Sequence, residues 1–281
     1  MFRLIAENRY GDKLELTNNE NYVVTSVDGI DPSDATINTS KYAGADGSKY
    51  NSSKVNEKKI TITLSINAPA EDNRIALYDY FQSKEYARLY IENGKRNVYI
   101  DGYVQQYPIG FFDKKQVAQI VIVCPNPFFE SLVVSEGEFS SVTKLFEFPF
   151  EIEEPIPFSE FDAFVERNVI NYGSVEAGAV FELHSKGEVI NPIIYLTSTG
   201  QYFGVNLDMV KGDSIIIDTR QGQKKVVLVR DGKETNIIGK VKEGSTWLIL
   251  RAGANLLSTS CEQSPEKLVA TCRMRSLYIG V

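Results

Sequence analysis

The clearest structural signal in the sequence is one alternating stretch, Lys59-Ile60-Thr61-Ile62-Thr63-Leu64-Ser65-Ile66-Asn67. Isoleucine or leucine occupies every second position from Ile60 to Ile66, and threonine or serine stands between them. Successive side chains of a strand point to opposite faces of a sheet, so a period of two predicts a strand with one buried and one exposed face. The fold around this stretch is therefore expected to be mainly β.

The sequence that follows supports the same class. Residues 88–92 and 98–104 are predicted to be two strands, joined by turn residues around Gly94. Residues 119–124 are apolar at nearly every position, which is typical of a strand covered on both faces. One helix is expected over residues 70–84, because acidic residues open it and apolar residues then recur at helical spacing.

The stretch from residue 167 onward contains short apolar runs separated by turn signals. These runs are residues 180–183, 193–196, 202–205, 214–218, 225–229, 247–250 and 276–279. Seven or more short strands at this spacing predict an antiparallel β-sandwich or jelly roll.

Length and charge suggest how these parts are organised. The chain has 281 residues, enough for about two domains. Its formal net charge of −7 argues against a general nucleic-acid binder, and it is spread unevenly. Residues 1–130 carry a net −2 and residues 167–281 a net +3, whereas residues 131–166 hold nine acidic residues and one lysine. We expect two domains joined by an acidic, proline-containing connection that leads into an edge strand. This connection is either a solvated linker or an acidic surface facing a basic partner.

The residues that enzymes use are sparse. His184 is the only histidine, which leaves one centre for a catalytic triad and excludes a histidine-based zinc site. Three scattered cysteines and the absence of a phosphate-binding loop predict no metal and no cofactor. The remaining candidates are carboxylates, Asp208, Asp213 and Asp218 around one strand and the adjacent Glu153-Glu154. Because a chain with 37 acidic residues contains such pairs by chance, we expect no enzyme.

Several motifs make the chain resemble the distal tail proteins of long-tailed bacteriophages, the siphophage tail component family. In the first domain these are a glycine-containing loop with Gly44, Asp46 and Gly47, and the ending Cys124-Pro125-Asn126-Pro127-Phe128. In the second domain they are Asn171, Gly173, Asn191, Pro192, Gly212, Asp213, Gly253 and Asn255. The resemblance covers nearly the whole chain, and its motifs are structural rather than catalytic.

The resemblance implies a structural virion protein. It implies a tail-tube-like β domain with one helix over residues 1–130, and a galectin-like antiparallel β-sandwich over residues 167–281. Members of this family form a hexameric ring at the distal end of the tail, assembled in the host cytoplasm. The implied partners are the tail-tube protein, the end of the tape-measure protein, the tail-tip hub or tail-associated lysin, and receptor-binding or baseplate proteins. DNA would pass through the lumen without sequence-specific contacts, and no membrane insertion is expected.

Two further hypotheses concern particular residues. The polar stretch 43–53 is expected to be a long, mobile assembly loop, with Ala43, Ser48, Lys49 and Tyr50 contacting a neighbouring protein or lining the ring. A carbohydrate-binding module is the alternative function, with Trp247, Tyr195 and Tyr202 as the aromatic contacts. The alternation around Trp247 favours a core position for its ring instead. A glycoside hydrolase is a third and weaker alternative, which requires a cleft with paired carboxylates.

Overall fold

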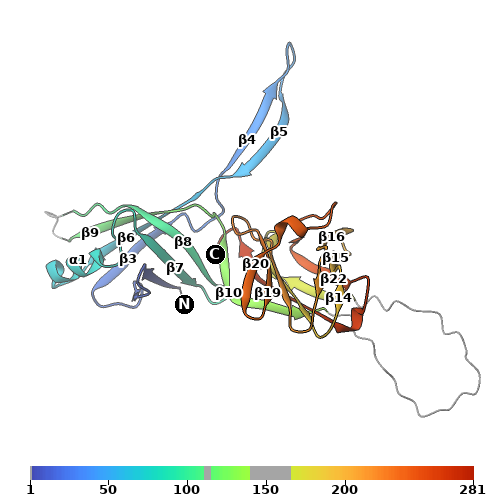
Figure 1. Ribbon diagram of the computed structural model, residues 1–281. Helices are drawn as coiled ribbons and strands as arrows, with labels where there is room; N and C mark the ends of the chain where they lie inside the picture. Colours follow the sequence, from blue (N-terminus) through green and yellow to red (C-terminus); the bar gives the residue numbers. More distant parts are fainter. Residues whose placement is uncertain (1, 111–114, 140–165) are drawn as a thin grey trace, which may run out of the picture. The chain divides into compact units, whose positions relative to one another are not determined.

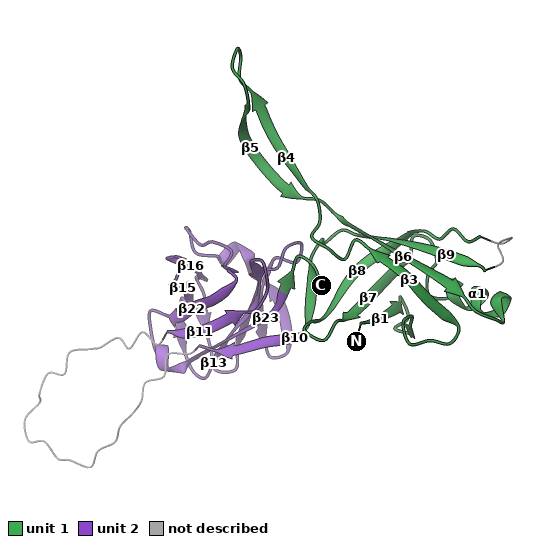
Figure 2. Cartoon of the chain, turned by 180° about the vertical axis from the view of Figure 1, so that it is seen from behind, with its two compact units in different colours: residues 1–132, 277–281 green, residues 133–276 purple. Residues whose placement is uncertain are grey.

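The computed structural model describes residues 2–110, 115–139 and 166–281. The chain divides into two compact units, residues 1–132 with 277–281 and residues 133–276 (Figure 2). The first is called unit 1 and the second unit 2, and each is described by itself. Both are built almost entirely from antiparallel strands, which confirms the mainly β prediction.

Unit 1 contains one helix and the first ten strands. They are β1 (Arg3–Asn8), β2 (Lys13–Glu15), β3 (Tyr22–Asp28), β4 (Ala35–Lys41), β5 (Ser48–Val55), β6 (Lys58–Ile66), α1 (Ala70–Tyr78), β7 (Tyr86–Glu92), β8 (Asn97–Gln106), β9 (Val117–Cys124) and the start of β10 (Phe129–Glu138). Seven of these strands form one antiparallel sheet in the order β2-β1-β7-β8-β9-β6-β3.

The alternating stretch forms β6, at the centre of the apolar core of unit 1. Ile60, Ile62 and Leu64 are fully buried, as the period of two predicts. β9 lies along β6 and adds the buried residues Ile120 and Ile122 to the same core. At about 1.5–3 kcal/mol for each fully buried aliphatic side chain, these two strands contribute a large part of the apolar stabilisation of unit 1.

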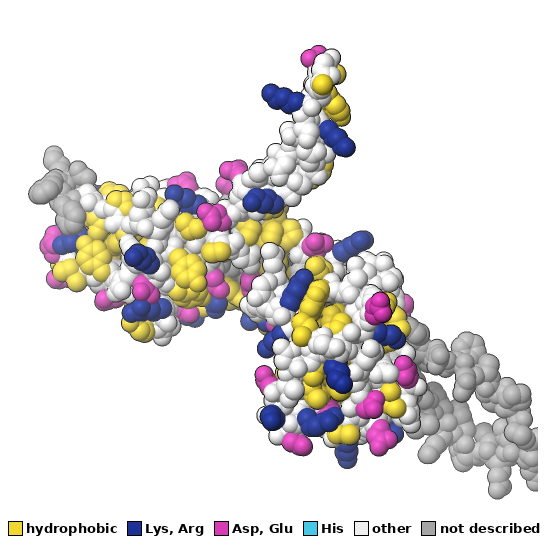
Figure 3. Space-filling model, turned by 45° about the horizontal axis from the view of Figure 1, so that its top comes forward, with side chains coloured by type: hydrophobic (Ala, Val, Ile, Leu, Met, Phe, Trp, Pro, Cys, Tyr) yellow, Lys and Arg dark blue, Asp and Glu magenta, His cyan; other side chains and the backbone are white. Residues whose placement is uncertain are grey.

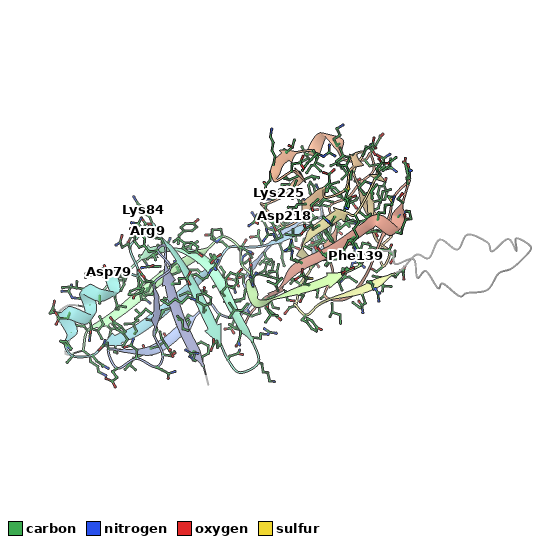
Figure 4. The ribbon with its side chains drawn as sticks, turned by 60° about the horizontal axis from the view of Figure 1, so that its bottom comes forward. Arg9, Asp79, Lys84, Phe139, Asp218 and Lys225 are labelled. Carbon is green, nitrogen blue, oxygen red and sulfur yellow. The ribbon has the colours of Figure 1, made fainter. Side chains whose placement is uncertain are left out.

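The predicted helix exists but is shorter than expected. It begins at Ala70 as predicted, yet it ends at Tyr78 rather than at residue 84. After Tyr78 the chain tightens, because the Asp79 amide donates to a carbonyl only three residues back. Lys84 then adopts φ +74°, and its amide donates to the carbonyl of Val104 at 2.8 Å. That bond draws the chain into the sheet at β7; Asp79 and Lys84 mark the two ends of the turn (Figure 4).

Unit 2 consists of two main antiparallel sheets. The first has the order β10-β23-β13-β18-β19-β20 and the second the order β11-β22-β15-β16. The remaining strands form the small pairs β12–β21 and β14–β17. Both main sheets contribute fully buried apolar residues, as the two layers of a sandwich do.

Five of the seven predicted runs coincide closely with strands of unit 2, whereas 247–250 contains only a two-residue strand and 276–279 only the end of a long one. Six further strands of unit 2 were not predicted. The strands of unit 2 are bounded as follows. They are β11 (Arg167–Asn171), β12 (Ala177–Gly178), β13 (Val180–Ser185), β14 (Val189–Ile190), β15 (Ile193–Leu196), β16 (Gln201–Gly204), β17 (Asp208–Met209), β18 (Ser214–Asp218), β19 (Lys225–Arg230), β20 (Lys233–Asn236), β21 (Ile249–Leu250), β22 (Gly253–Ser260) and β23 (Leu268–Tyr278). Two short 3-10 helices span Ile238–Lys240 and Pro265–Lys267.

The acidic connection is described only in part. Its first residues belong to β10, which in unit 2 lies at the end of the strand order beside β23. Phe139 follows β10 and is fully buried, with its ring 6.2 Å from that of Phe181 (Figure 4). Residues 140–165, which carry six of the nine acidic residues and both members of the Glu153-Glu154 pair, lie outside the described residues.

Candidate functional site

A β-hairpin projecting from unit 1 is the most distinctive surface feature of the chain (Figure 1). Its strands, β4 and β5, pair with each other and form a two-stranded sheet of their own. The expectation of a long loop over residues 43–53 is therefore wrong for residues 48–53, which belong to β5. Gly44 and Gly47 lie in the tip and have positive φ angles of 78° and 91°, which glycine adopts without strain.

The hairpin has one apolar and one polar face. Register pairs and the bond between the Tyr50 and Ser53 hydroxyls place Tyr50, Ser53, Ile37 and Val55 on the same face. A bulge beside Asn38 keeps this face continuous, because it shifts the register by one residue before Tyr50. Ile37 is 63% exposed, Tyr50 59% and Val55 47%, so the described chain leaves this face uncovered.

The opposite face is polar and basic. Asn38 donates to the Ser52 hydroxyl at 3.0 Å across the two strands, and Lys49 and Lys54 lie on the same side. The hairpin, residues 35–55, carries three lysines and one aspartate, a net of +2. The rest of residues 1–132 carries 12 basic and 16 acidic residues. A basic arm therefore extends from an acidic body, and lysines and apolar side chains are both visible along it (Figure 3).

The Cys124-Pro125-Asn126-Pro127-Phe128 motif joins two strands that share one edge of β8. β9 ends at Cys124, and β10 begins at Phe129 and pairs with the first half of β8. The prolines fit this break because they cannot donate a ladder hydrogen bond, and the Phe128 amide instead donates to the Asn126 side chain at 3.3 Å. Burial raises the pKa of the Cys124 thiol to about 12, so this residue is packed and not nucleophilic.

Four motif residues of unit 2 form a pair of asparagine clamps. Asn171 and Gly253 lie opposite each other in the β11–β22 ladder. The Asn171 side chain donates to the carbonyls of Val175 and Leu250 and accepts from the Gly173 amide. The Asn255 side chain, on β22, binds the backbone just before it: it donates to the carbonyls of Arg251 and Gly253 and accepts from the Arg251 amide. The structure thus brings these residues together and gives them a structural role in holding two loops.

The other motif residues of unit 2 lie at turns. Asn191 adopts φ +51°, and Pro192 follows it before β15. Gly212 has φ +94° and precedes Asp213, which is 1% exposed. The Asp213 carboxylate accepts two hydrogen bonds from the Arg230 guanidinium, which hold its pKa below the usual range.

Two family models match most of the chain. The phage tail protein RIFT-related domain matches residues 10–124, and the C-terminal domain of the siphovirus-type tail component matches residues 172–272. Together they cover most of both units and eleven of the fifteen motif residues; Pro125, Pro127, Phe128 and Asn171 lie just outside the matched ranges. The chain belongs to the siphophage distal tail protein family.

Solved structures share the fold of this distal tail protein. The crystal structure of the Dit protein of phage SPP1, described as a paradigm of the hub adsorption apparatus in phages infecting Gram-positive hosts, aligns over 99% of each chain with a TM-score of 0.70 and 11% identity. A chain of the phage P2 baseplate in its activated conformation with calcium aligns over 97% of this chain and 98% of that chain, with a TM-score of 0.51 and 10% identity. A search of curated protein sequences found no match.

The distal tail protein is a structural phage tail component and not an enzyme, as its family membership supports. His184 lies on β13 with its ring 3.0 Å from the Ser214 hydroxyl. Asp213 and Asp218 do not form a carboxylate pair, because the first binds Arg230 and the second binds Arg220.

Within the described residues, no group of three or more histidine, cysteine or acidic side chains is placed to hold a metal ion. Over the same residues, no helix is both long enough and apolar enough to cross a membrane. Figure 4 shows Asp218 beside Lys225, its partner in the β18–β19 register.

The glycan-contact candidates are only partly brought together. Tyr195 and Tyr202 are register partners with ring centroids 6.2 Å apart, and both are partly exposed. The predicted core position of Trp247 is only partly met, because its half-buried ring contacts both Phe203 and the ammonium group of Lys224. The Trp247 ring therefore packs against residues of unit 2 itself. Sugar recognition by Tyr195 and Tyr202 stays a prediction.

Sequence reasoning missed the apolar face of the hairpin. Ile37 and Val55 lay outside the predicted loop, and β4 was not predicted as a strand. Every residue of β4 and β5 is exposed, so neither strand needs the hydrophobic alternation that reveals a half-buried strand. The remaining signal was weak: β-branched Thr36, Ile37 and Thr39 before a glycine-rich turn.

Proposed function

We propose that this protein forms a homohexameric ring at the distal end of the phage tail. The ring would join the tail tube and the end of the tape-measure protein to the tail-tip hub or tail-associated lysin. Unit 2 would present its galectin-like sandwich to receptor-binding or baseplate proteins. Assembly would take place in the cytoplasm of the host, and DNA would later pass through the lumen without sequence-specific contacts. Family membership and the shared fold with hub and baseplate proteins support this role.

The observation that carries the ring proposal is the uncovered apolar face of the hairpin. A two-stranded hairpin standing alone in water is marginally stable, and large exposed apolar side chains on one face favour a protein contact. We infer that the occupant is a second copy of this chain. The hairpin is basic, whereas the rest of residues 1–132 is acidic, so one copy complements the next in charge.

A head-to-tail contact of this kind is heterologous, since the hairpin of one copy meets a different surface of its neighbour. Repetition of a heterologous contact closes into a ring when the rotation per copy divides a full turn. The same contact would account for Ser48 and Tyr50 as assembly residues, because both lie on the apolar face of β5 close to the tip, whereas Lys49 lies on the opposite, polar face.

The proposal is tested with the full-length chain and paired hairpin variants. Ile37→Ser combined with Tyr50→Ser removes two large side chains of the apolar face. Asn38→Ala combined with Ser52→Ala alters the polar face at the neighbouring register pair and serves as the control. Mass photometry and negative-stain microscopy should show rings for the wild type and the polar-face control. The apolar-face variant should remain monomeric while keeping its thermal unfolding temperature. Rings of normal size from the apolar-face variant would overturn the hairpin contact.

A further inference from the structure

The last residues of the sequence leave unit 2 and pack in unit 1, at the base of the hairpin. Residues 277–281 belong to unit 1, although the chain before them belongs to unit 2. The Val281 amide donates to the Ile30 carbonyl at 3.2 Å. The Arg96 guanidinium donates to the Gly280 carbonyl and lies 4.6 Å from the centroid of the Tyr278 ring. Residues 278–281, called the strap below, are thus fixed from both sides.

A buried lysine joins the strap to the hairpin base. Lys58 is 2% exposed, and its ammonium group donates to the carbonyls of Asp31 and Ile279. It also lies 5.1 Å from the centroid of the Phe129 ring. Burial lowers the pKa of Lys58. The two carbonyls, the aromatic face and the attraction of the Asp31 carboxylate hold a charge whose burial is otherwise costly.

At the base of the hairpin, the backbone of the strap and the backbone on both sides of the hairpin approach one another closely. A Cβ atom on Gly280 would lie 3.0 Å from the Ile30 carbonyl oxygen and 3.3 Å from Pro32 Cδ. A Cβ atom on Gly29 would lie 2.0 Å from the Lys59 carbonyl oxygen, and Gly29 has φ +85°. Gly29 is therefore required at this base, whereas a side chain at Gly280 would have to displace its neighbours slightly.

Lys58 and its carbonyl partner on Asp31 lie next to the backbone segments about which the hairpin could rotate. The Asn56 amide donates to the Asp34 carbonyl at 2.9 Å, which closes the base of the hairpin. Asp31 lies just before this closure and Lys58 just after it, so one ammonium group ties the incoming chain, the outgoing chain and the strap. Beyond this point β4 and β5 pair with nothing else in the described chain.

We propose that the strap and Lys58 form a positioning device that holds the β4–β5 hairpin at a fixed angle to unit 1. Without it, the hairpin would pivot about residues 34 and 56 while the sheet of unit 1 stayed folded. Because β23 of unit 2 continues directly into the strap, the direction of the hairpin depends on a segment supplied by the other end of the sequence. This inference concerns a single chain and does not depend on whether that chain forms a ring.

The test is a pair of spin-label distances within one chain. Labels are placed at Asn51→Cys on the hairpin and at Ile75→Cys on α1, in a Cys261→Ser background that leaves only the buried Cys124 and Cys272. Double electron–electron resonance is recorded on labelled chain diluted with unlabelled chain, so that only distances within one molecule contribute.

Lys58→Met is compared with Lys59→Met, a matched loss of one lysine at the neighbouring, exposed position. The wild type and Lys59→Met should give one narrow distance distribution, and Lys58→Met should broaden it about twofold. Deletion of residues 278–281 should broaden it in the same way, which keeps the test valid if one variant fails to fold. Distributions of equal width in every folded variant, or a broad distribution in the wild type, would overturn the proposal.

Discussion

Replacing the hairpin separates its role in assembly from any role in folding. The replacement removes residues 36–54 and joins Ala35 to Val55 through an Asn-Gly turn, which suits a tight two-residue hairpin connection. It keeps the Asn56–Asp34 backbone bond that closes the base. The shortened chain therefore loses the paired strands β4 and β5 and retains Lys58 and the strap.

The expected effect on stability follows from burial. Every residue of β4 and β5 is exposed, and none belongs to the apolar core of unit 1. Changes at exposed positions are usually within about 0.5 kcal/mol, so the free energy of unfolding should be nearly unchanged. Phe129→Ala is the contrasting control, because that ring is fully buried and its loss should cost about 3–5 kcal/mol.

The assay is urea denaturation followed by fluorescence, with particle mass measured in parallel by mass photometry. The shortened chain should keep the midpoint and slope of the wild type and should lose ring formation. A loss of more than about 1.5 kcal/mol would mean that the hairpin supports the fold, which contradicts its exposure. Rings formed by the shortened chain would refute the assembly role.

Three other predictions follow from the geometry. Gly102→Val places a Cβ atom 2.5 Å from a methyl carbon of Ile122 and should destabilise unit 1 by about 1–3 kcal/mol in denaturant titrations, whereas Gly239→Ala, with open space around it, should be neutral. Asp213→Asn should cost about 1–3 kcal/mol at neutral pH by removing the ion pair with Arg230. Since the folded-state pKa of Asp213 is lowered, the stability difference between wild type and Asp213→Asn should persist above the unfolded value of about 3.9 and disappear as pH falls through the folded value. A reconstruction of the ring should show a neutral or acidic lumen, and a strongly basic lining would contradict free passage of DNA.

The sequence predicted those parts of the fold whose burial leaves a periodic pattern. The β6 stretch was identified because one face is buried and the other is not. The end of the helix was not, because Lys84 turns into the sheet through a bond to Val104, a residue far along the chain. Such a tertiary bond has no local signature.

The candidate site was only partly predictable for a related reason. The tip residues around Gly44 and Gly47 pointed to an exposed element, but the paired strands below them have no buried face to reveal their register. The contacts of Lys58 with the strap could not be predicted, because Lys58 looks like an ordinary surface lysine in the sequence. Its burial depends on Ile279, which lies near the opposite end of the chain.

The proposed role of this protein depends on its assembly into a closed ring. The most direct test is the mass and projected shape of the purified full-length chain, measured across a concentration series by mass photometry and negative-stain microscopy. We expect a ring of about 190 kDa, six copies of the 31.5 kDa chain, with a central opening. A chain that stays monomeric at every concentration, both alone and with tail-tube and hub proteins added, would contradict it.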